Sequence, residues 1–323
     1  MPFIEYSTYH TPLFRSNGHF QSIYPTLFRK VTGVRYEREQ IDTPDGDFLD
    51  LDWSRVGSRK VAILSHGLEG DSNRHYILGQ VKSLNFGGWD ACAWNFRGCS
   101  GATNRTLKFY HSGATYDLDT VIQHIRRVGH YDEIALIGYS LGGNMTLKYL
   151  GDLGEAVPSE ISASVVFSAP VDLAASSLKI GQWYNKIYMM RFLRSLHGKI
   201  RAKMPLFPDA LNDDHYVESV KNFKDFDDRY TAPIHGFKDA ADYWAQCSSK
   251  PGLAKIKIPT LLVSARNDPF LTQSCFPVEA AKASQYFHFE NPKAGGHVGF
   301  MSNNQSGEYW SDQRAVAFLE HKY

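Results

Sequence analysis

Six short apolar runs, separated by loops and helix-like segments, constrain the fold of this chain more than any other feature. They cover residues 60–66, 89–95, 133–140, 162–171, 258–265 and 284–290. Segments with apolar residues at helical spacing, 117–127, 141–150 and 309–318, lie between or after these runs. Continuous apolar strands that alternate with helices are typical of a mostly parallel sheet covered on both faces. The sequence therefore predicts an α/β fold.

Two β-like runs precede this pattern and predict an antiparallel edge to the sheet. Residues 34–43 and 47–53 flank the turn Pro44-Asp45-Gly46. Two such runs around a Pro-Asp-Gly turn are typical of a β-hairpin. The aromatic-rich residues before them, about 1–33, are expected to form an N-terminal arm.

A long interval between the fourth and fifth apolar runs interrupts the alternation. Residues 172–256 contain no convincing buried strand. An excursion of this length between two core strands is more often an inserted helical subdomain than a single loop. We therefore expect a core formed by residues 1–171 and 257–323, with an inserted helical cap at 172–256.

The first half of the expected cap is strongly basic. Residues 173–208 contain seven Lys and Arg residues and no Asp or Glu, and Ile187, Met190, Leu193, Leu196 and Ile200 lie beside these cations at helical spacing. A basic amphipathic helix can lie transiently on a membrane surface. The same pattern also fits a cap helix whose apolar side packs on the protein, with the Asp-rich residues 209–228 neutralising its charge. Both interpretations stay open at this point.

The composition limits the classes of partner. A chain of 323 residues with 43% hydrophobic residues can bury a full core, as one large domain with an insertion or as two small domains. Because 35 basic residues stand against 34 acidic ones, no global field attracts nucleic acid, and no nucleic-acid partner is expected. The oligomeric state cannot be read from the sequence.

Cysteines and terminal segments bear on compartment and cofactors. Cys92, Cys99, Cys247 and Cys275 form no CxxC pair and no zinc spacing. They suit a reducing compartment better than a disulfide framework. The first ten residues show no secretory signal, and no stretch approaches the length of a membrane span. We expect a soluble cytoplasmic protein that uses no metal and no cofactor.

The sharpest local motif is Gly138-Tyr139-Ser140-Leu141-Gly142. It follows an apolar run and precedes a helix-like segment, which is the context that a nucleophile elbow requires. The residues two before and two after the serine must be small, because the serine sits in a strained turn. Alternatively, the glycines serve only the packing of a strand-to-helix turn. The motif by itself does not decide between these interpretations.

A serine nucleophile needs a base, and the base needs an orienting acid. In this kind of fold the chain order is Ser, then Asp or Glu, then His. Asp268 follows the run 258–265, and His297 follows the run 284–290 within a glycine-rich loop. We therefore select Ser140, Asp268 and His297 as candidate catalytic residues. The alternatives are Asp172 for the acid, and His288, His235 and His321 for the base.

An oxyanion formed during acyl transfer needs two N–H donors. Leu141 should supply one, because it directly follows Ser140 at the start of a helix. The other should come from the loop His66-Gly67-Leu68-Glu69-Gly70, where we select Leu68. Residues 66–71 also spell the HxxxxD pattern of some acyltransferases, which we interpret as coincidence because His66 belongs to the oxyanion loop.

Taken together, these residues resemble the YheT-like branch of the α/β-hydrolase superfamily, which includes eukaryotic lipid esterases and yeast ethyl-ester synthases. The matching pieces span nearly the whole chain in order: SNGHFQSIYP, SHGLEGD, NFRGCSGATNR, YHSGATYDL, GYSLGGNM, FDDRYTAPIHGF, YWAQCSS, NDPF and GGHVGF. The resemblance implies an eight-stranded sheet with a helical cap between 162–169 and 258–265. It also places the triad of the family on Ser140, Asp268 and His297. The first half of the cap matches least well.

The function predicted by the triad and the resemblance is hydrolysis of carboxylic esters with short- to medium-chain acyl groups, or of lipids, through an acyl-enzyme. One alternative is an acyltransferase that passes the acyl group to an alcohol. A further alternative is a non-catalytic binding protein, since a fold does not fix function. The expected partner is a small-molecule ester or lipid, whose identity the sequence does not reveal.

Overall fold

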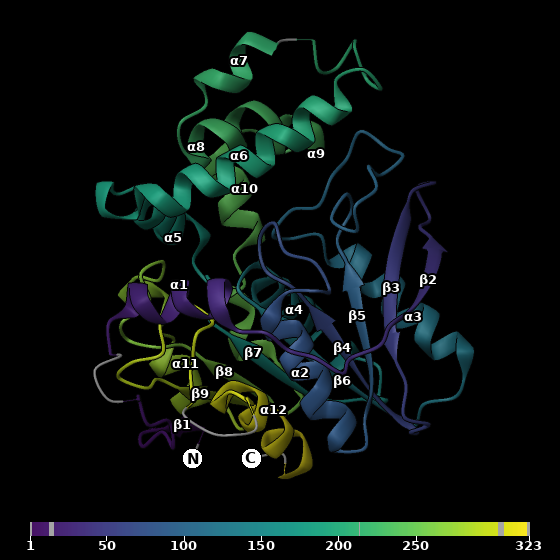
Figure 1. The fold of residues 1–323 in the computed structure, drawn as a ribbon, viewed down its shortest axis with the longest axis vertical. Helices are drawn as coiled ribbons and strands as arrows, with labels where there is room; N and C mark the ends of the chain where they lie inside the picture. The colour runs from purple at the N-terminus through teal and green to yellow at the C-terminus, as the bar shows by residue number, and fades with distance from the viewer. Residues whose placement is uncertain (1, 13–15, 213, 303–306, 322–323) are drawn as a thin grey trace.

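The computed structural model describes residues 2–12, 16–212, 214–302 and 307–321. Their strands form one nine-stranded sheet in the order β1-β9-β8-β7-β6-β4-β5-β3-β2 (Figure 1). The strands are β1 (Phe3–Ile4), β2 (Glu37–Asp42), β3 (Phe48–Ser54), β4 (Lys60–Ser65), β5 (Asp90–Asn95), β6 (Glu133–Tyr139), β7 (Ile161–Phe167), β8 (Thr260–Val263) and β9 (Phe287–Glu290).

The sheet is mostly parallel, with an antiparallel edge where the sequence predicts a hairpin. Strand β2 pairs antiparallel with β3, and β3 pairs antiparallel with β5. All other neighbouring strands are parallel. The α/β fold and all six apolar runs are confirmed as predicted.

The number of strands differs from the eight that the family resemblance implies. The additional strand is β1, which pairs parallel with β9 through only two residues, Phe3 and Ile4. Two residues are too few to show the alternation by which a strand is found in a sequence. Through β1, the N-terminal arm joins the sheet.

Strands β4 to β8 contribute side chains to two separate cores, one on each face of the sheet. In β4, Val61 and Ile63 face one core, and Ala62 and Leu64 face the other. This follows from the two-residue period of a strand. The first core is covered by α3 (Thr115–Val128), α4 (Leu141–Leu153) and α11 (Val278–Ala283). The second is covered by α2 (His75–Phe86) and α12 (Trp310–His321).

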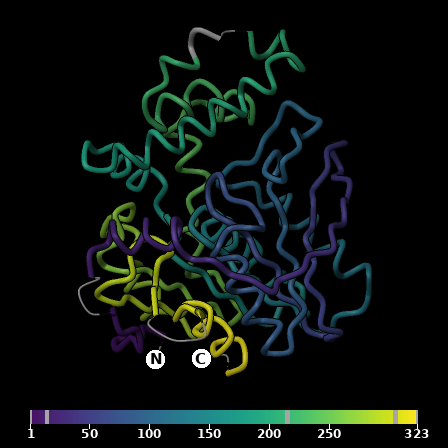
Figure 2. The backbone as a smooth tube through the Cα atoms, viewed as in Figure 1, coloured from purple at the N-terminus to yellow at the C-terminus, as the bar shows by residue number. Residues whose placement is uncertain are grey.

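Between β7 and β8 the described residues form helices and no strand. These helices lie together above the sheet, at the top of Figures 1 and 2. They are α5 (Leu173–Ile180), α6 (Lys186–Lys203), α7 (Asp214–Ser219), α8 (Phe223–Phe226), α9 (Ala232–His235) and α10 (Ala240–Cys247). Helix α1 (Gly18–Phe28) belongs to the N-terminal arm. The division of the chain into a core and a cap at 172–256 stays a prediction.

Helix α6 carries apolar side chains on two sides. Leu193, Leu196 and Ile200 are buried in a core of the upper helices, as the protein-packing interpretation expects. Ile187 and Met190 are 76% and 60% exposed, so part of the apolar pattern faces outward. Within the described ranges, no helix is long and apolar enough to cross a membrane.

Candidate active site

Ser140 lies in the turn between β6 and α4 with a left-handed backbone, φ 52° and ψ −117°. The glycines around it are required by space. A Cβ on Gly138 would stand 2.6 Å from the Cα of Gly143, and one on Gly142 would stand 2.4 Å from the carbonyl oxygen of His66. Such a strained conformation is uncommon for a residue other than glycine, and it is found mainly at functional sites.

The structure brings together the three residues that the sequence selects for catalysis. The Nε2 of His297 lies 2.9 Å from the Oγ of Ser140, and its Nδ1 lies 2.8 Å from the Oδ2 of Asp268. Asp268 is fully buried, and its Oδ1 accepts a hydrogen bond of 2.8 Å from the backbone N–H of Phe270. The arrangement can move a proton from the hydroxyl to the imidazole while the carboxylate fixes the ring.

Polar contacts from distant segments hold the loop of His297. The backbone N–H of His297 donates to the Oγ of Ser22 in α1 at 2.8 Å. The next amide, of Val298, donates to the Oγ of Ser168 at 3.0 Å, and Gly296 donates to the side chain of Asn267 at 2.9 Å. Sequence reasoning missed these supporting residues, although Ser22 lies within the segment SNGHFQSIYP that carries part of the resemblance.

The alternative acid and bases lie elsewhere. The carboxylate of Asp172 caps α5 by accepting from the backbone N–H of Ala175 at 3.1 Å. The ring of His288, in β9, packs on the ring of Phe318. His235 ends α9, and His321 ends α12.

Two backbone amides remain for an oxyanion. The N–H of Gly67 donates to the hydroxyl of Tyr76, and the N–H of Glu69 donates to that of Tyr110, each at 3.0 Å. The N–H groups of Gly70 and Gly142 also have backbone partners, the carbonyls of Gly67 and His66. Within the described part of the chain, the amides of Leu68 and Leu141 have no such partner. These two amides are therefore available to an oxyanion, and their role as donors stays a prediction.

His66 is a structural residue of the oxyanion loop. Its Nδ1 donates to the carbonyl of Gly67 at 2.8 Å, and its Nε2 accepts from the backbone N–H of Phe96 at 3.1 Å. Burial lowers the pKa of His66 to about 3, so the ring is neutral. With both ring nitrogens engaged, His66 has no free atom with which to act as a base in an HxxxxD motif.

Glu69 ties the oxyanion loop to α6. It has a positive φ of 54°, and its carboxylate lies 2.9 Å from the Nζ of Lys199. It also accepts hydrogen bonds from the hydroxyls of Tyr110 and Ser195. The loop that would carry an oxyanion donor is therefore held on two sides, by the core and by the helix above.

Ser140 lies between an apolar pocket and a larger cleft. The pocket, with a volume of about 100 Å³, extends under the upper helices and is lined mainly by aromatic and aliphatic side chains, including Phe109, Leu196, Phe223 and Phe226. The cleft, of about 970 Å³, opens on the other side and is also lined by His297. A small-molecule site that is mostly apolar with a few polar groups is common in enzymes.

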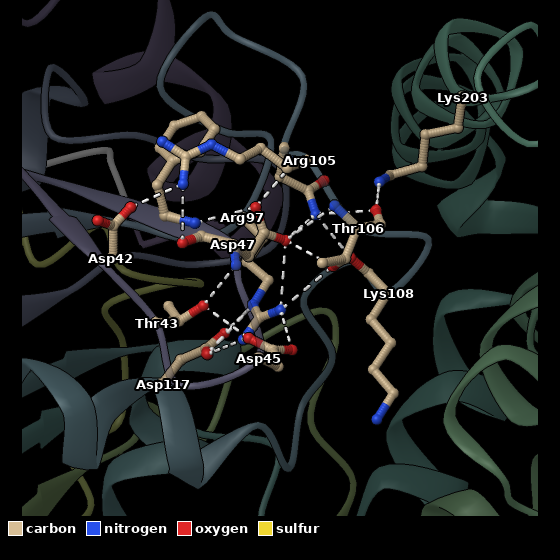
Figure 3. A network of polar contacts seen from close by, with 12 residues as sticks. Asp42, Thr43, Asp45, Asp47, Arg97, Arg105, Thr106, Lys108, Asp117 and Lys203 are labelled. Atoms are coloured by element: carbon tan, nitrogen blue, oxygen red, sulfur yellow. Dashed lines mark hydrogen bonds and ion pairs between the residues drawn. The ribbon is translucent and has the colours of Figure 1, made fainter.

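A buried ionic network holds the segment that precedes Phe109 (Figure 3). The guanidinium of Arg97 forms a bidentate ion pair with Asp117, at 2.6 and 2.9 Å, and reaches Asp45 at 2.7 Å and Asp47 at 3.3 Å. Asp47 in turn accepts from residues 104–106, just before Phe109. Sequence reasoning did not anticipate this network, since its members are up to about seventy positions apart.

No metal site is evident in the described ranges, where no group of three or more His, Cys, Asp or Glu could hold an ion. The residues that line the site are of the types from which a nucleophile, a base and an orienting acid are built. Such a set can carry out acyl transfer through a covalent intermediate.

Comparisons with known proteins agree with this geometry. A family model described as alpha/beta hydrolase fold matches residues 61–303. The chain is 36% identical over 310 residues to "Putative esterase YheT" of Escherichia coli (strain K12), covering 94% of this chain and 90% of that protein. It is 28% identical over 304 residues to "Phospholipase ABHD3" of Homo sapiens, covering 91% of this chain and 74% of that protein.

Among solved structures, esterase Pf2001 of Pyrococcus furiosus has a similar fold, with a TM-score of 0.59. At 18% sequence identity, the match covers 91% of this chain and 98% of that chain. A likeness at this level of identity concerns the fold alone.

Proposed function

The chain belongs to the α/β-hydrolase fold family and, within it, to the branch of YheT; it is a hydrolase, and we propose that it cleaves carboxylic esters through Ser140, His297 and Asp268. The observation that carries the proposal is the hydrogen-bonded series from Ser140 Oγ through His297 to Asp268. The esterase and phospholipase names of its relatives support ester or lipid substrates.

In the first step, Ser140 Oγ attacks the ester carbonyl while His297 Nε2 takes the hydroxyl proton. The amides of Leu68 and Leu141 stabilise the resulting oxyanion. His297 then returns the proton to the leaving alcohol, and the acyl group remains on Ser140. Asp268 accepts the Nδ1–H of the ring, which keeps Nε2 free to act as the base.

In the second step, water attacks the acyl-enzyme and releases the acid. The apolar pocket receives the acyl chain, because it is lined mainly by aromatic and aliphatic side chains. Short- to medium-chain acyl groups stay a prediction. Replacing water by an alcohol at this step would make the enzyme an acyltransferase. Product analysis with and without ethanol separates the two activities, because only transfer yields an ethyl ester.

The outward apolar side of α6 supports a transient contact with a membrane surface. Trp183, just before α6, is 83% exposed and lies near Ile187 and Met190 in sequence, beside the cations Lys186 and Arg194. Exposed apolar and basic side chains on one helix suit the surface of an anionic bilayer. A blue shift of tryptophan fluorescence with phosphatidylglycerol vesicles, lost in Trp183→Phe, is expected; no shift and no co-flotation would refute the contact.

The test of the proposed function is the Ser140→Ala variant with p-nitrophenyl butyrate. We expect kcat to fall by about 10⁶-fold, with an unchanged circular-dichroism spectrum. Ser159→Ala, at an exposed serine far from the site, serves as the matched control and keeps full activity. Full activity of Ser140→Ala would refute the assignment, and a wild type without any esterase activity would favour the non-catalytic alternative.

A further inference from the structure

The cleft on the open side of Ser140 carries an excess of positive charge. Its walls come from α1, the oxyanion loop, the start of α2 and α6. They include five cations and one carboxylate, that of Glu69; the cations are Arg29, Lys30, Arg74, Arg191 and Arg194. Because Glu69 is already paired with Lys199, it does not balance these cations.

Several of these cations have unused hydrogen-bonding capacity. Within the described residues, Arg191 and Arg194 form no ion pair. The side chain of Arg29 is only 4% exposed, pairs with Asp312 and stacks on the ring of Tyr309, yet its Nε and Nη1 have no hydrogen-bond partner among the described residues. In the described ranges, the buried Nε of Arg74 has no hydrogen bond, although it forms an ion pair with Asp71 at 3.6 Å, and the buried Nδ1 of His75 has no hydrogen bond either. Buried polar groups without a hydrogen bond are rare in folded proteins and call for an explanation.

The cations converge on one place at the start of α2. Burial, followed by the charges of Arg29, Arg74 and Arg191, lowers the pKa of His75 to about 3. The N-cap of this 12-residue helix, Arg74, supplies no side-chain capping bond. The positive end of the helix dipole thus adds to the same field. The positive potential there is the condition under which an anion binds well.

The position of His297 tells which part of an ester would occupy the cleft. His297 lines the cleft but not the apolar pocket, whereas Ser140 lines both. The leaving alcohol takes its proton from His297, so it departs on the cleft side. The acyl chain then lies in the apolar pocket.

We propose that the cleft is an anion-binding subsite, centred on Arg29, Arg74, Arg191 and Arg194. It selects esters whose alcohol part carries a phosphate. This inference rests on the proposed function and adds the chemical class of its substrate. Arginine favours phosphate because its planar fork donates two parallel hydrogen bonds. The phosphate could belong to a soluble phosphorylated alcohol or to a lipid headgroup.

The test compares kcat/KM for 1-butyrylglycerol and 1-butyrylglycerol 3-phosphate, which differ only in the anion. Wild type is expected to prefer the phosphate ester, and Arg191→Gln/Arg194→Gln to lower this preference by about tenfold or more. Arg191→Lys/Arg194→Lys should keep part of it. Both arginines are exposed, so the variants are expected to fold.

Arg201→Gln is the matched control. Arg201 lies on the same helix but pairs with Glu218 and does not line the cleft, so its replacement should leave the preference unchanged. An equal preference in Arg191→Gln/Arg194→Gln and wild type would overturn the subsite. So would equal kcat/KM for the two esters in wild type.

Two further arms separate the sources of the anion and the two proposals. The first arm uses 1-lauroylglycerol 3-phosphate in neutral micelles. If the preference for the phosphate ester is seen only in micelles and the arginine variants do not change it, the preference reflects the micelle surface and the subsite is overturned. Calorimetry with inorganic phosphate on Ser140→Ala tests anion binding independently of ester hydrolysis. Phosphate binding that is weaker when Arg191→Gln/Arg194→Gln is added supports the subsite, even if the protein hydrolyses no ester. If phosphate binds neither protein, the subsite is refuted.

Discussion

The carboxyl edge of the sheet and the helices above it are held in different ways. At the edge, Ser140 is fixed by its own turn, and Asp268 is fixed by burial and a backbone amide. The upper helices reach the core partly through long cationic side chains. Lys179 donates to the carbonyl of Leu271, and Lys203 donates to that of Thr106.

This difference separates the residues proposed to react from the residues that would select the substrate. The groups that react belong to short turns of the core, where a small displacement would break the proton path. The pocket and cleft take walls from helices tied by flexible cations, so these walls can differ between relatives without moving Ser140. The four predictions below test this separation.

The largest effect is expected on activity at the sheet edge. Asp268→Asn leaves the size of the side chain unchanged but cannot orient His297 in the useful tautomer, so kcat should fall by about 10⁴-fold. Steady-state assay with p-nitrophenyl butyrate measures it. The control is Asp172→Asn, at the first residue of the expected cap, whose carboxylate caps α5. If Asp172→Asn were the inactive variant, the orienting acid would be Asp172 and not Asp268, and the assignment would be wrong.

The next effect concerns stability. Arg97→Met leaves Asp45, Asp47 and Asp117 together without their buried cation, and the free energy of unfolding should fall by about 3–5 kcal/mol. Urea denaturation followed by circular dichroism measures the change. Arg59→Met, which removes an exposed pair with Asp132, should not shift the midpoint measurably. Equal shifts in both variants would mean that the network does not hold the core.

A smaller effect is expected at the junction of the two regions. Lys199→Met leaves the buried carboxylate of Glu69 without its cation and loosens the loop of Leu68, so kcat/KM should fall by about 10- to 100-fold. The control is Lys186→Met at the exposed start of the same helix. Should Lys199→Met retain full activity, the oxyanion loop would depend on the core alone.

The last effect is a pH dependence of stability from the upper helices, which is spread over about three pH units. Burial raises the pKa of Asp227 from 3.8 to about 7, so the folded chain binds this proton more tightly than the unfolded chain. The proton on Asp227 therefore contributes to the free energy of unfolding. This contribution is complete below about pH 4, declines between pH 4 and 7, and is lost above pH 7. Asp227→Asn should remove this slope, at most about 1.4 kcal/mol per pH unit. Thermal melts of both proteins at pH 5 and 7 measure it; parallel changes would contradict the assignment.

The core could be predicted from the sequence because local pattern and final position agree there. Strands such as 60–65 have an uninterrupted apolar centre, residues 61–64, since both faces are buried there. Asp268 and His297 each follow a strand whose end fixes their place. The same logic fails for β1, where two residues show no period.

The upper helices and the cleft are harder to predict for a physical reason. The cationic subsite joins Arg29, Arg74 and Arg191, which are separated by 45 and 117 positions and meet only through packing. The Arg97 network likewise joins distant residues. The basic character of 173–208 was visible in the sequence, but its distribution between the protein interior and the cleft was not.

The central claim is that Ser140 is the nucleophile, and labelling with a fluorophosphonate probe tests it most directly. Mass spectrometry of digested wild-type protein should find a single adduct, on Ser140, and labelling should be lost in Ser140→Ala and strongly slowed in His297→Ala. An adduct on another residue, or ester hydrolysis that continues after Ser140 is replaced, would contradict the account.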